Sequence, residues 1–270
     1  MATSAQASVR NPQATQGRFA WHDLMTSDPA AAKAFYVGVI GWGTQDWPGT
    51  TPYTLWMAGD AMVGGVMQLP DEAQQQGAPS HWLTYIETQD IDETYALATK
   101  LGAQTFVPPT DIPTVGRFAV LSDPQGATFA LFTPLPSENP PMKDLGRAGE
   151  FSWHELMTTN QDAAFSFYEG LFGWKKTSAM DMGDHGVYQM FGITSDIPLG
   201  GLYTIPEGMG APPNWLPYIH VDSADAAAER VKQLDGSIKN GPMDVPGGDR
   251  ITICADPQGC VFAVHSKANA

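Results

Sequence analysis

The sequence of 270 residues contains few basic residues: 14 Lys and Arg stand against 29 Asp and Glu, a formal net charge of −15. A surface of this sign repels nucleic-acid phosphates and anionic membranes, so we expect neither as a partner. Long apolar runs are also missing, since no stretch approaches the ~18 consecutive apolar residues of a transmembrane helix. The N-terminal stretch MATSAQASVRNPQATQG lacks the basic and apolar regions of a secretory signal, so we expect a cytoplasmic protein.

Cysteine is scarce as well, because Cys254 and Cys260 are the two in the chain. They cannot supply a disulfide framework or a Cys-rich metal site. They flank one turn and could become neighbours across a hairpin, but we expect two reduced thiols. What the chain does have is apolar residues, at 43% of the sequence, and this length and composition favour two domains over one small one.

The same sequence pattern occurs twice. RFAWHDLMTSD at 18–28 returns as EFSWHELMTTN at 150–160, an offset of 132 residues from Trp21 to Trp153, and DPQG at 123–126 returns at 256–259. One duplicated domain explains both matches. The predicted organisation is an N-terminal tail over 1–16, a first domain over 17–135, a linker over 136–148 and a second domain over 149–268. The linker is assigned from its proline and polar content.

Within each copy, one order of elements occurs twice: a strand, a helix and three more strands. For the first helix, Asp28 is a cap, Gly41 is the stop, and the apolar stripe is Ala32, Phe35, Tyr36 and Val39. The helix of the next unit has the stripe Thr94, Leu97, Ala98 and Leu101. The paired glycines 64–65 and 200–201 fall inside strands, where they indicate bulges or a close approach by another group. The pattern predicts an α+β fold of four βαβββ modules.

These motifs resemble the vicinal oxygen chelate superfamily, which includes glyoxalase I, extradiol dioxygenases and bleomycin-binding proteins. The resemblance rests on the helix signature Phe35-Tyr36 followed by Gly41-Trp42, on the tandem module order and on the two DPQG turns. The motif W-x-[DE]-L-M-T is similar to a bacterial tandem glyoxalase-like group. The resemblance implies two glyoxalase-like domains, each a strongly curved mixed sheet whose concave face usually holds a divalent metal. It also makes a symmetric homodimer a candidate assembly.

The metal positions that the resemblance implies carry unsuitable residues here. They are occupied by Trp21, Leu83 and Ala130 in the first copy and by Trp153, Leu216 and Ala263 in the second. None of these side chains offers a ligand atom, so we expect no metal cofactor at the usual place. The alternative is a displaced divalent-metal site of Glu155, His220 and His265 in the second copy.

Strand alternation indicates which polar side chains face the cavity, because alternate residues share a face. If Trp21 and Trp153 point inward, so do Asp23 and Glu155. These two carboxylates are the candidate catalytic residues, as general bases whose pKa burial would raise. The alternative is a carboxylate satisfied by a backbone N–H or an arginine. Alternation places His22 and His154 on the opposite, core-facing side.

Ten further residues are candidates for ligand contact because they are aromatic, charged or imidazole side chains on the strands or turns near the cavity. They are Trp21, Trp56, Tyr85, Glu87, Arg117, Trp153, Tyr218, His220, Arg250 and His265. For Glu87 and His220 the alternative is a solvent-exposed strand end. For the two arginines, the alternatives are recognition of an acidic ligand or pairing with Asp23 and Glu155.

The favoured hypothesis is a protein that binds a small organic ligand in its concave cavities without the family metal. One alternative is a lyase, isomerase or oxygenase of the same superfamily that uses Asp23 or Glu155 as a base. A second is a regulatory protein whose acidic surface meets a basic partner.

Overall fold

The computed structural model describes residues 16–49, 51–75, 77–136 and 146–267. The predicted tail over 1–16, apart from its last residue, and most of the linker over 136–148 lie outside these residues. Among the helices of the described ranges, none is long and apolar enough to cross a membrane.

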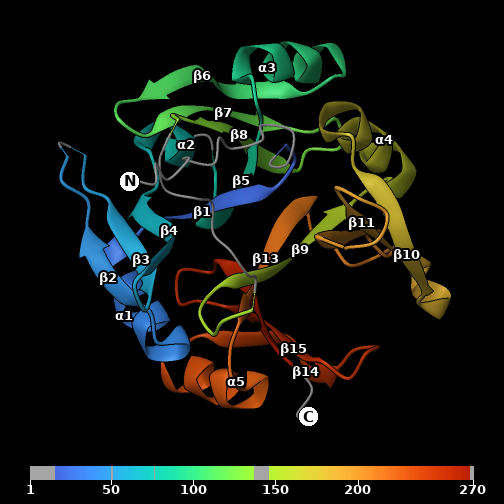
Figure 1. The fold of residues 1–270 in the computed structure, drawn as a ribbon. Helices are drawn as coiled ribbons and strands as arrows, with labels where there is room; N and C mark the ends of the chain where they lie inside the picture. Colours follow the sequence, from blue (N-terminus) through green and yellow to red (C-terminus); the bar gives the residue numbers. More distant parts are fainter. Residues whose placement is uncertain (1–15, 50, 76, 137–145, 268–270) are drawn as a thin grey trace, which may run out of the picture.

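The first half of the chain forms one eight-stranded mixed sheet (Figure 1). Its elements are β1 (Phe19–Thr26), α1 (Pro29–Ile40), β2 (Gly43–Asp46), β3 (Thr54–Ala58), β4 (Ala61–Gln68), α2 (Asp71–Gln75), β5 (His81–Glu87), α3 (Ile91–Lys100), β6 (Gln104–Ile112), β7 (Gly116–Ser122) and β8 (Thr128–Pro134). The strand order is β2-β3-β4-β1-β5-β8-β7-β6. Two modules therefore join where β1 and β5 pair antiparallel.

The second half repeats this arrangement. Its elements are β9 (Phe151–Thr158), α4 (Gln161–Phe172), β10 (Lys175–Asp181), the 3₁₀ turn η2 (Gly183–His185), β11 (Val187–Gly192), β12 (Gly200–Thr204), β13 (Asn214–His220), α5 (Ala224–Gln233), β14 (Ser237–Asp244), β15 (Arg250–Ala255) and β16 (Val261–Ser266). The order β10-β11-β12-β9-β13-β16-β15-β14 matches the first sheet strand for strand. The predicted α+β fold with two repeated domains is confirmed.

The first helix of the first domain begins and ends as its sequence predicts, and the first helix of the second domain ends in the same way. The carboxylate of Asp28 accepts hydrogen bonds from the backbone N–H groups of Ala30 and Ala31 at 3.1 and 3.0 Å. Gly41 ends α1 at a φ of 87°, and Gly173 ends α4 at 70°. Residues with a Cβ avoid this left-handed conformation, which is why glycine ends both helices.

Helix α3 differs from its predicted stripe. Thr94 and Ala98 are buried, but the third buried residue is Ile91, and Leu97 and Leu101 are 36% and 40% exposed. The buried side is therefore rotated toward the first turn of the helix. A second difference is α2, a short helix over Asp71–Gln75 that is not among the elements of the predicted βαβββ modules.

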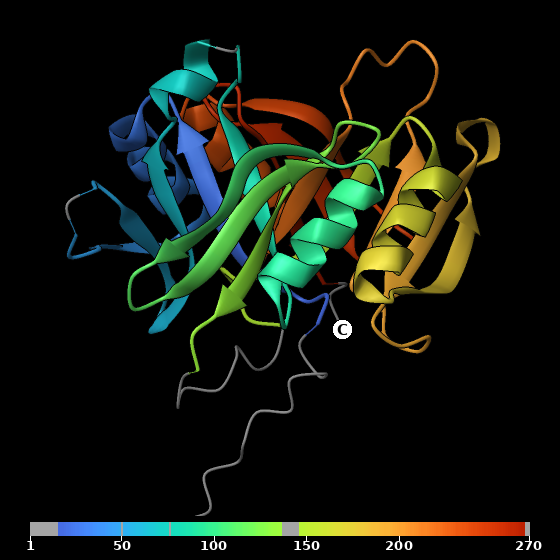
Figure 2. The same ribbon diagram turned by 90° about the horizontal axis from the view of Figure 1, so that it is seen from above.

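Each domain contributes to two shared hydrophobic cores. In one core, α1 of the first domain packs beside α5 of the second; in the other, α3 packs beside α4 (Figures 1 and 2). Trp42 of the first domain donates its indole N–H to the Gly149 carbonyl at 2.7 Å, and Trp174 of the second donates to the Gly17 carbonyl at 2.9 Å. The two domains are joined by equivalent contacts in both directions.

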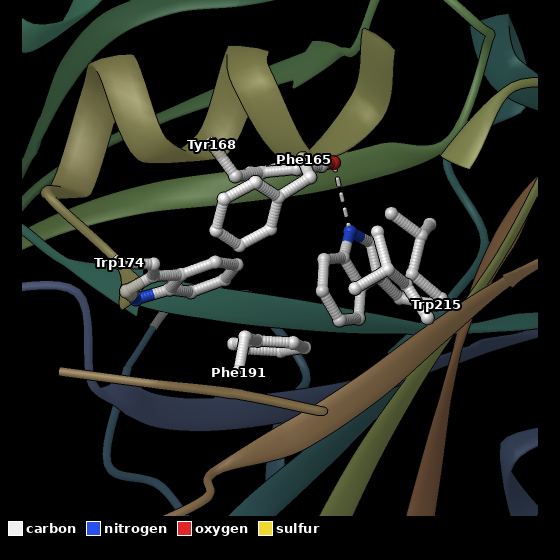
Figure 3. Close-up of a pocket in the computed structure, with 7 residues that line it drawn as sticks. Phe165, Tyr168, Trp174, Phe191 and Trp215 are labelled. Carbon is white, nitrogen blue, oxygen red and sulfur yellow. Dashed lines mark hydrogen bonds between the residues drawn. The ribbon is translucent and has the colours of Figure 1, made fainter. Parts of the chain in front are cut away.

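The second core contains an aromatic cluster around α4. Figure 3 shows Phe165, Tyr168, Trp174, Phe191 and Trp215 packed around a small gap, with the indole N–H of Trp215 donating to the Tyr168 hydroxyl at 2.9 Å. The gap has no room for even a water molecule. This cluster therefore serves packing between the domains and is not a ligand site.

The predictions for the two histidines and the two cysteines are confirmed. His22 and His154 lie in the core between the two sheets, 3% and 4% exposed. Cys254 and Cys260 are buried free thiols, and they are not bonded to each other.

Candidate functional site on the open sheet faces

Each sheet carries an apolar cluster on the face turned away from the two shared cores, and we call this face the open face. In the first domain it is formed by Leu83, Tyr85, Val120 and Ala130, with partly exposed Trp21, Met25, Val107, Phe118 and Phe132 around them. In the second it is formed by Leu216, Tyr218 and Ala263, with Trp153, Ile251 and Ile253 partly exposed. The predicted alternation is confirmed, since Trp21 lies on the open face whereas Leu24 lies in the core.

A buried carboxylate lies on the open face of the first domain. Asp23 is 5% exposed and accepts three hydrogen bonds. Tyr53 and Trp21 donate to Oδ1 at 2.6 and 2.9 Å, and Tyr85 donates to Oδ2 at 2.8 Å. Burial raises the pKa of Asp23, and the three hydrogen bonds oppose that shift because they stabilise the ionised form.

The second domain has the same arrangement around Glu155. Tyr188 and Tyr218 hydrogen-bond its carboxylate, and the indole N–H of Trp153 donates to the Tyr188 hydroxyl at 2.8 Å. Burial raises the pKa of Glu155 to about 7, and the two tyrosines oppose that shift. The Trp21 N–H is shared between Asp23 and the Tyr53 hydroxyl, which lies 2.8 Å away, whereas the corresponding Trp153 donates to Tyr188. A carboxyl group with a pKa near neutrality exists both as acid and as base under physiological conditions.

The paired glycines make both sites possible. Gly65 lies opposite Asp23 in the β1–β4 ladder, and Gly201 lies opposite Glu155 in the β9–β12 ladder. A Cβ at Gly65 would overlap the Tyr53 hydroxyl, and one at Gly201 would overlap the Tyr188 ring. Glycine on the intervening strand thus lets each tyrosine cross it and reach the carboxylate. The predicted close approach at both pairs is confirmed.

The structure groups four of the ten predicted contact residues with the two carboxylates. Trp21 and Tyr85 join Asp23, and Trp153 and Tyr218 join Glu155. Tyr53 was not among the predicted contact residues. The sequence did hold a signal for it, because both copies have a tyrosine one strand before the glycine pair, Tyr53 in the first copy and Tyr188 in the second. The carboxylates are satisfied by tyrosine and indole donors, so the alternative of a backbone N–H or an arginine partner is wrong.

Three predicted ligand contacts lie elsewhere. Trp56 is fully buried in the first shared core, where it packs against Tyr36 and Trp42, because its side of β3 faces α1. Arg117 pairs with Asp92 at 3.2 Å and Asp111 at 2.7 Å. Arg250 pairs likewise with Asp225 at 2.5 Å and Asp244 at 2.7 Å. Pairing of the arginines with Asp23 and Glu155 is therefore wrong, because nearer carboxylates on the adjacent helix and strand take their place.

Glu87 and the two histidines lie at the ends of their strands. Glu87 is 7% exposed, so the alternative of a solvent-exposed carboxylate is wrong for it. His220 is partly buried, and its ring centroid lies 5.5 Å from that of His265.

The structure does not assemble the displaced metal site. Glu155 is opposite Leu216 in the β9–β13 ladder, and His220 lies four residues further along β13, roughly 13 Å away at about 3.3 Å per residue. Within the described ranges, no group of three or more His, Cys, Asp or Glu side chains could hold a metal ion.

The positions where the family usually binds its metal are no more suitable for a metal than the displaced site. Ala130 lies beside Tyr85 and Ala263 beside Tyr218 in the parallel ladders, with Trp21 and Trp153 one strand away. The tyrosine hydroxyls beside these positions are already bound to a carboxylate. The residues present at these positions therefore do not fit a divalent metal.

A cleft of about 560 Å³ lies at the edge of the first domain. It is formed by the start of α3, the β6–β7 turn and the end of β8, and Arg117 is among its lining residues. Because Asp92 and Asp111 already neutralise this arginine, the cleft offers no free positive charge from it to an acidic ligand.

Proteins of similar sequence cover nearly the whole chain. "Putative glyoxylase CFP32" of Mycobacterium tuberculosis is 32% identical over 256 residues, which span 94% of this chain and 96% of that protein. "Anthracycline biosynthesis protein DauV" of Streptomyces sp. (strain C5) is 30% identical over 260 residues, 92% of each chain.

Solved structures show the same fold at lower identity. The Mn(II)-bound glyoxalase from Novosphingobium aromaticivorans superposes with a TM-score of 0.63 at 17% identity, covering 94% of this chain and 83% of that one. Homoprotocatechuate 2,3-dioxygenase from Arthrobacter globiformis gives 0.66 at 14% identity, covering 96% and 82%. The family profile matches residues 18–131 and again 150–264. The chain therefore belongs to the Glyoxalase/Bleomycin resistance protein/Dioxygenase superfamily, with one family unit in each half.

Proposed function

We propose that this protein binds a small planar organic molecule with an acidic hydroxyl group on its open sheet faces, and that it does so without the family metal. The single observation that carries the proposal is the buried Glu155 carboxyl group between Tyr188 and Tyr218, with its pKa raised to about 7. A buried carboxylate at this pKa gains from a ligand that donates a hydrogen bond or a proton to it. The equivalent Asp23 gives the first domain a related site.

The surroundings of Glu155 suit an aromatic ligand. Trp153, Ile251 and Ile253 are partly exposed on the same face, and they offer apolar and indole surface to a flat ring system. The relative named for anthracycline biosynthesis supports a fused-ring ligand, since anthracyclines contain a planar aromatic core. The ligand would lie across Trp153 with its hydroxyl group directed at the carboxylate.

The test is a binding titration with alizarin, a planar dihydroxyanthraquinone whose colour reports the ionisation of its phenol. Binding is followed by quenching of tryptophan fluorescence and by the visible spectrum of the bound dye. We expect Glu155→Gln to weaken binding at least about tenfold, because a hydrogen bond to a charged group contributes about 1.5–3 kcal/mol. The exposed Glu207→Gln is the matched control and keeps the affinity. Equal affinity in wild type and in an Asp23→Asn, Glu155→Gln double variant would overturn the proposal.

A proton-transfer enzyme is the second candidate, and the same pKa favours it. A carboxylate that titrates near 7 removes a proton from an acidic C–H or O–H group and returns it efficiently at neutral pH. Anthrone, a planar tricyclic ketone with an acidic methylene group, tests this directly in D₂O. We expect the protein to accelerate exchange at that methylene and Glu155→Gln to remove the acceleration. Exchange at the buffer rate in the presence of bound anthrone would leave binding as the function.

A further inference from the structure

A hydroxyl, an imidazole and a carboxylate are linked in series at one end of the second open face. Ser152 Oγ on β9 lies 3.1 Å from His265 Nδ1 on β16. His265 Nε2 lies 2.9 Å from the carboxylate of Asp249, in the turn between β14 and β15. Three side chains from separate parts of the second domain thus form one hydrogen-bonded chain, distinct from the Glu155 site.

The repeat shows that the fold does not need this cluster. At the equivalent positions the first domain has Ala20, Phe132 and Gly116, yet it forms the same eight-stranded sheet. Neighbouring His220 likewise corresponds to Glu87. Since the twin domain folds with residues that cannot form the chain, the cluster in the second domain calls for an explanation other than stability.

Local backbone geometry explains how Ser152 reaches the histidine. The β9–β13 register shifts at this point, so that Trp153 is opposite Tyr218 and Phe151 is opposite Ile219, which leaves Ser152 without a partner residue. The first domain has the same irregularity between Phe19 and Trp21. An unpaired bulge residue can turn its side chain toward a neighbouring strand, and bulges often direct functional side chains in this way.

We propose that the second domain hydrolyses small carboxylic esters. In this proposal Ser152 is the nucleophile, His265 is the base that activates it, and Asp249 orients His265. With Nε2–H held by Asp249, His265 presents the lone pair of Nδ1 to the Ser152 hydroxyl at 3.1 Å, a shorter contact than the 3.4 Å from Ser152 Oγ to the Tyr218 carbonyl oxygen that competes for the same proton. The nitrogens are exchanged relative to the usual serine-hydrolase arrangement, but the requirement is the same: one nitrogen takes the proton while a carboxylate fixes the other.

The reaction consumes only the ester and one water molecule. Ser152 Oγ bonds to the ester carbonyl carbon as its proton passes to His265 Nδ1; the ester C–O bond then breaks, and His265 gives that proton to the leaving alcohol oxygen. Water next attacks the acyl carbon, loses a proton to His265, and the Ser152 oxygen leaves and is reprotonated. The products are a carboxylic acid and an alcohol.

Neighbouring residues suit this role. His220, whose ring is 5.5 Å from that of His265 and whose Nδ1 has no partner, is the nearby imidazole available to turn and donate to the developing oxyanion. Ile251 is opposite His265 in the β15–β16 ladder, and Trp153 follows Ser152 on β9. Their partly exposed apolar surface favours an ester with an alkyl or aromatic group.

The experiment is covalent labelling of the full-length protein with a fluorophosphonate probe, followed by mass spectrometry of the labelled peptide. The Ser152 oxygen displaces fluoride from phosphorus, so the adduct identifies the nucleophile. We expect label on Ser152, none there in Ser152→Ala, and labelling at least about 100-fold slower in His265→Phe, since general-base assistance contributes about 10²–10⁴-fold. These variants take residues from the first domain, which folds with them. Ser195→Ala, at an exposed serine, is the control and labels normally.

A second readout separates nucleophilic catalysis from a packing role. Hydrolysis of p-nitrophenyl acetate should show a burst of one p-nitrophenolate per protein, lost in Ser152→Ala and slowed in Asp249→Asn. An unlabelled Ser152 in folded wild-type protein, or labelling at the wild-type rate in folded His265→Phe, would overturn the proposal. The Asp23→Asn, Glu155→Gln double variant should still label, so failure of the ligand-binding proposal would not be mistaken for failure of this one.

Discussion

The Nε2 atoms of His22 and His154 lie 2.7 Å apart in the core between the two domains, at equivalent positions of the repeat. His22 stacks on Phe151 and His154 on Phe19, so each imidazole packs against an aromatic ring. His154 also hydrogen-bonds the Leu199 backbone, which favours a proton on its other nitrogen. The pair is then neutral: His22 donates from Nε2 and His154 accepts.

Acid should therefore weaken the contact between the domains. Burial lowers the pKa of His22, and it lowers that of His154 to about 3, from the ordinary 6.5. The unfolded chain binds more protons below pH 6.5, so this stabilisation is complete above pH 6.5 and is lost as the pH falls toward the folded values. For His154 the loss between pH 6.5 and 5 is about 2 kcal/mol, at about 1.4 kcal/mol per pH unit, and His22 adds to the loss in the same direction.

Urea unfolding at pH 7 and pH 5 measures this loss. The His22→Ala, His154→Ala double variant should be less stable than wild type at pH 7, because it leaves a cavity, but it should lose less stability on acidification. The two single variants complete a double-mutant cycle and should show coupling of about 0.5–3 kcal/mol. An identical acid-induced loss in wild type and the double variant would mean that other groups control the acid response.

Alternation along strands explains what the sequence could predict. Once Trp21 was assigned inward, Asp23 followed, and the repeat transferred both assignments to Trp153 and Glu155, because side chains two residues apart share a face. Trp56 failed because no anchor fixed the face of its strand. Tyr53 was missed because its contact passes over the intervening strand β4 to reach Asp23, and one strand's periodicity carries no information about that crossing.

The predicted pairing of the two arginines with Asp23 and Glu155 was wrong for a related reason. The sequence shows that Arg117 and Arg250 occupy matched positions, but it does not rank the carboxylates available to each. In the structure, Asp111 lies directly opposite Arg117 across the β6–β7 hairpin, as Asp244 does opposite Arg250. Proximity set by register therefore determines these partners, and the cavity carboxylates are left to the tyrosines.

The buried Glu155 should make the protein less stable as the pH rises, whereas the histidine pair makes it less stable as the pH falls. The Glu155→Gln substitution should remove the first of these two effects. The pKa of Glu155 is about 7 in the folded protein and 4.5 ordinarily, so the folded state binds more protons between these values. The contribution of Glu155 to the free energy of unfolding is therefore complete below pH 4.5, and it is lost as the pH rises through 7.

Glutamine stays neutral, so the variant should gain up to about 3 kcal/mol relative to wild type between pH 4.5 and 8. Chemical denaturation at these two pH values is the measurement, with Glu207→Gln as the exposed control. A stability difference that does not change with pH would show that Glu155 titrates normally.

The Tyr188→Phe substitution should raise the pKa of Glu155 further. Tyr188 hydrogen-bonds the carboxylate and thereby lowers its pKa against the larger effect of burial. Loss of one such bond costs the ionised form about 1.5 kcal/mol, equivalent to about one pKa unit. Carbon-13 NMR of the carboxyl group gives the value, and Tyr95→Phe, a tyrosine that bonds Thr105 instead, is the control. A pKa that stays the same or falls in Tyr188→Phe would remove this tyrosine from the site.

The Gly201→Ala substitution should reproduce that pKa shift without altering any titratable or hydrogen-bonding side chain. Its new methyl group would overlap the Tyr188 ring, which must move away from Glu155 or strain the sheet. We expect a loss of about 1–3 kcal/mol in the free energy of unfolding, as for overpacked sites, together with a higher pKa of Glu155. Gly43→Ala is the matched control, since a Cβ there would lie 3.4 Å from Met57, an ordinary contact. If Gly201→Ala lost stability while the Glu155 pKa stayed at the wild-type value, glycine would serve sheet packing alone, and the tyrosine would reach the carboxylate by another route.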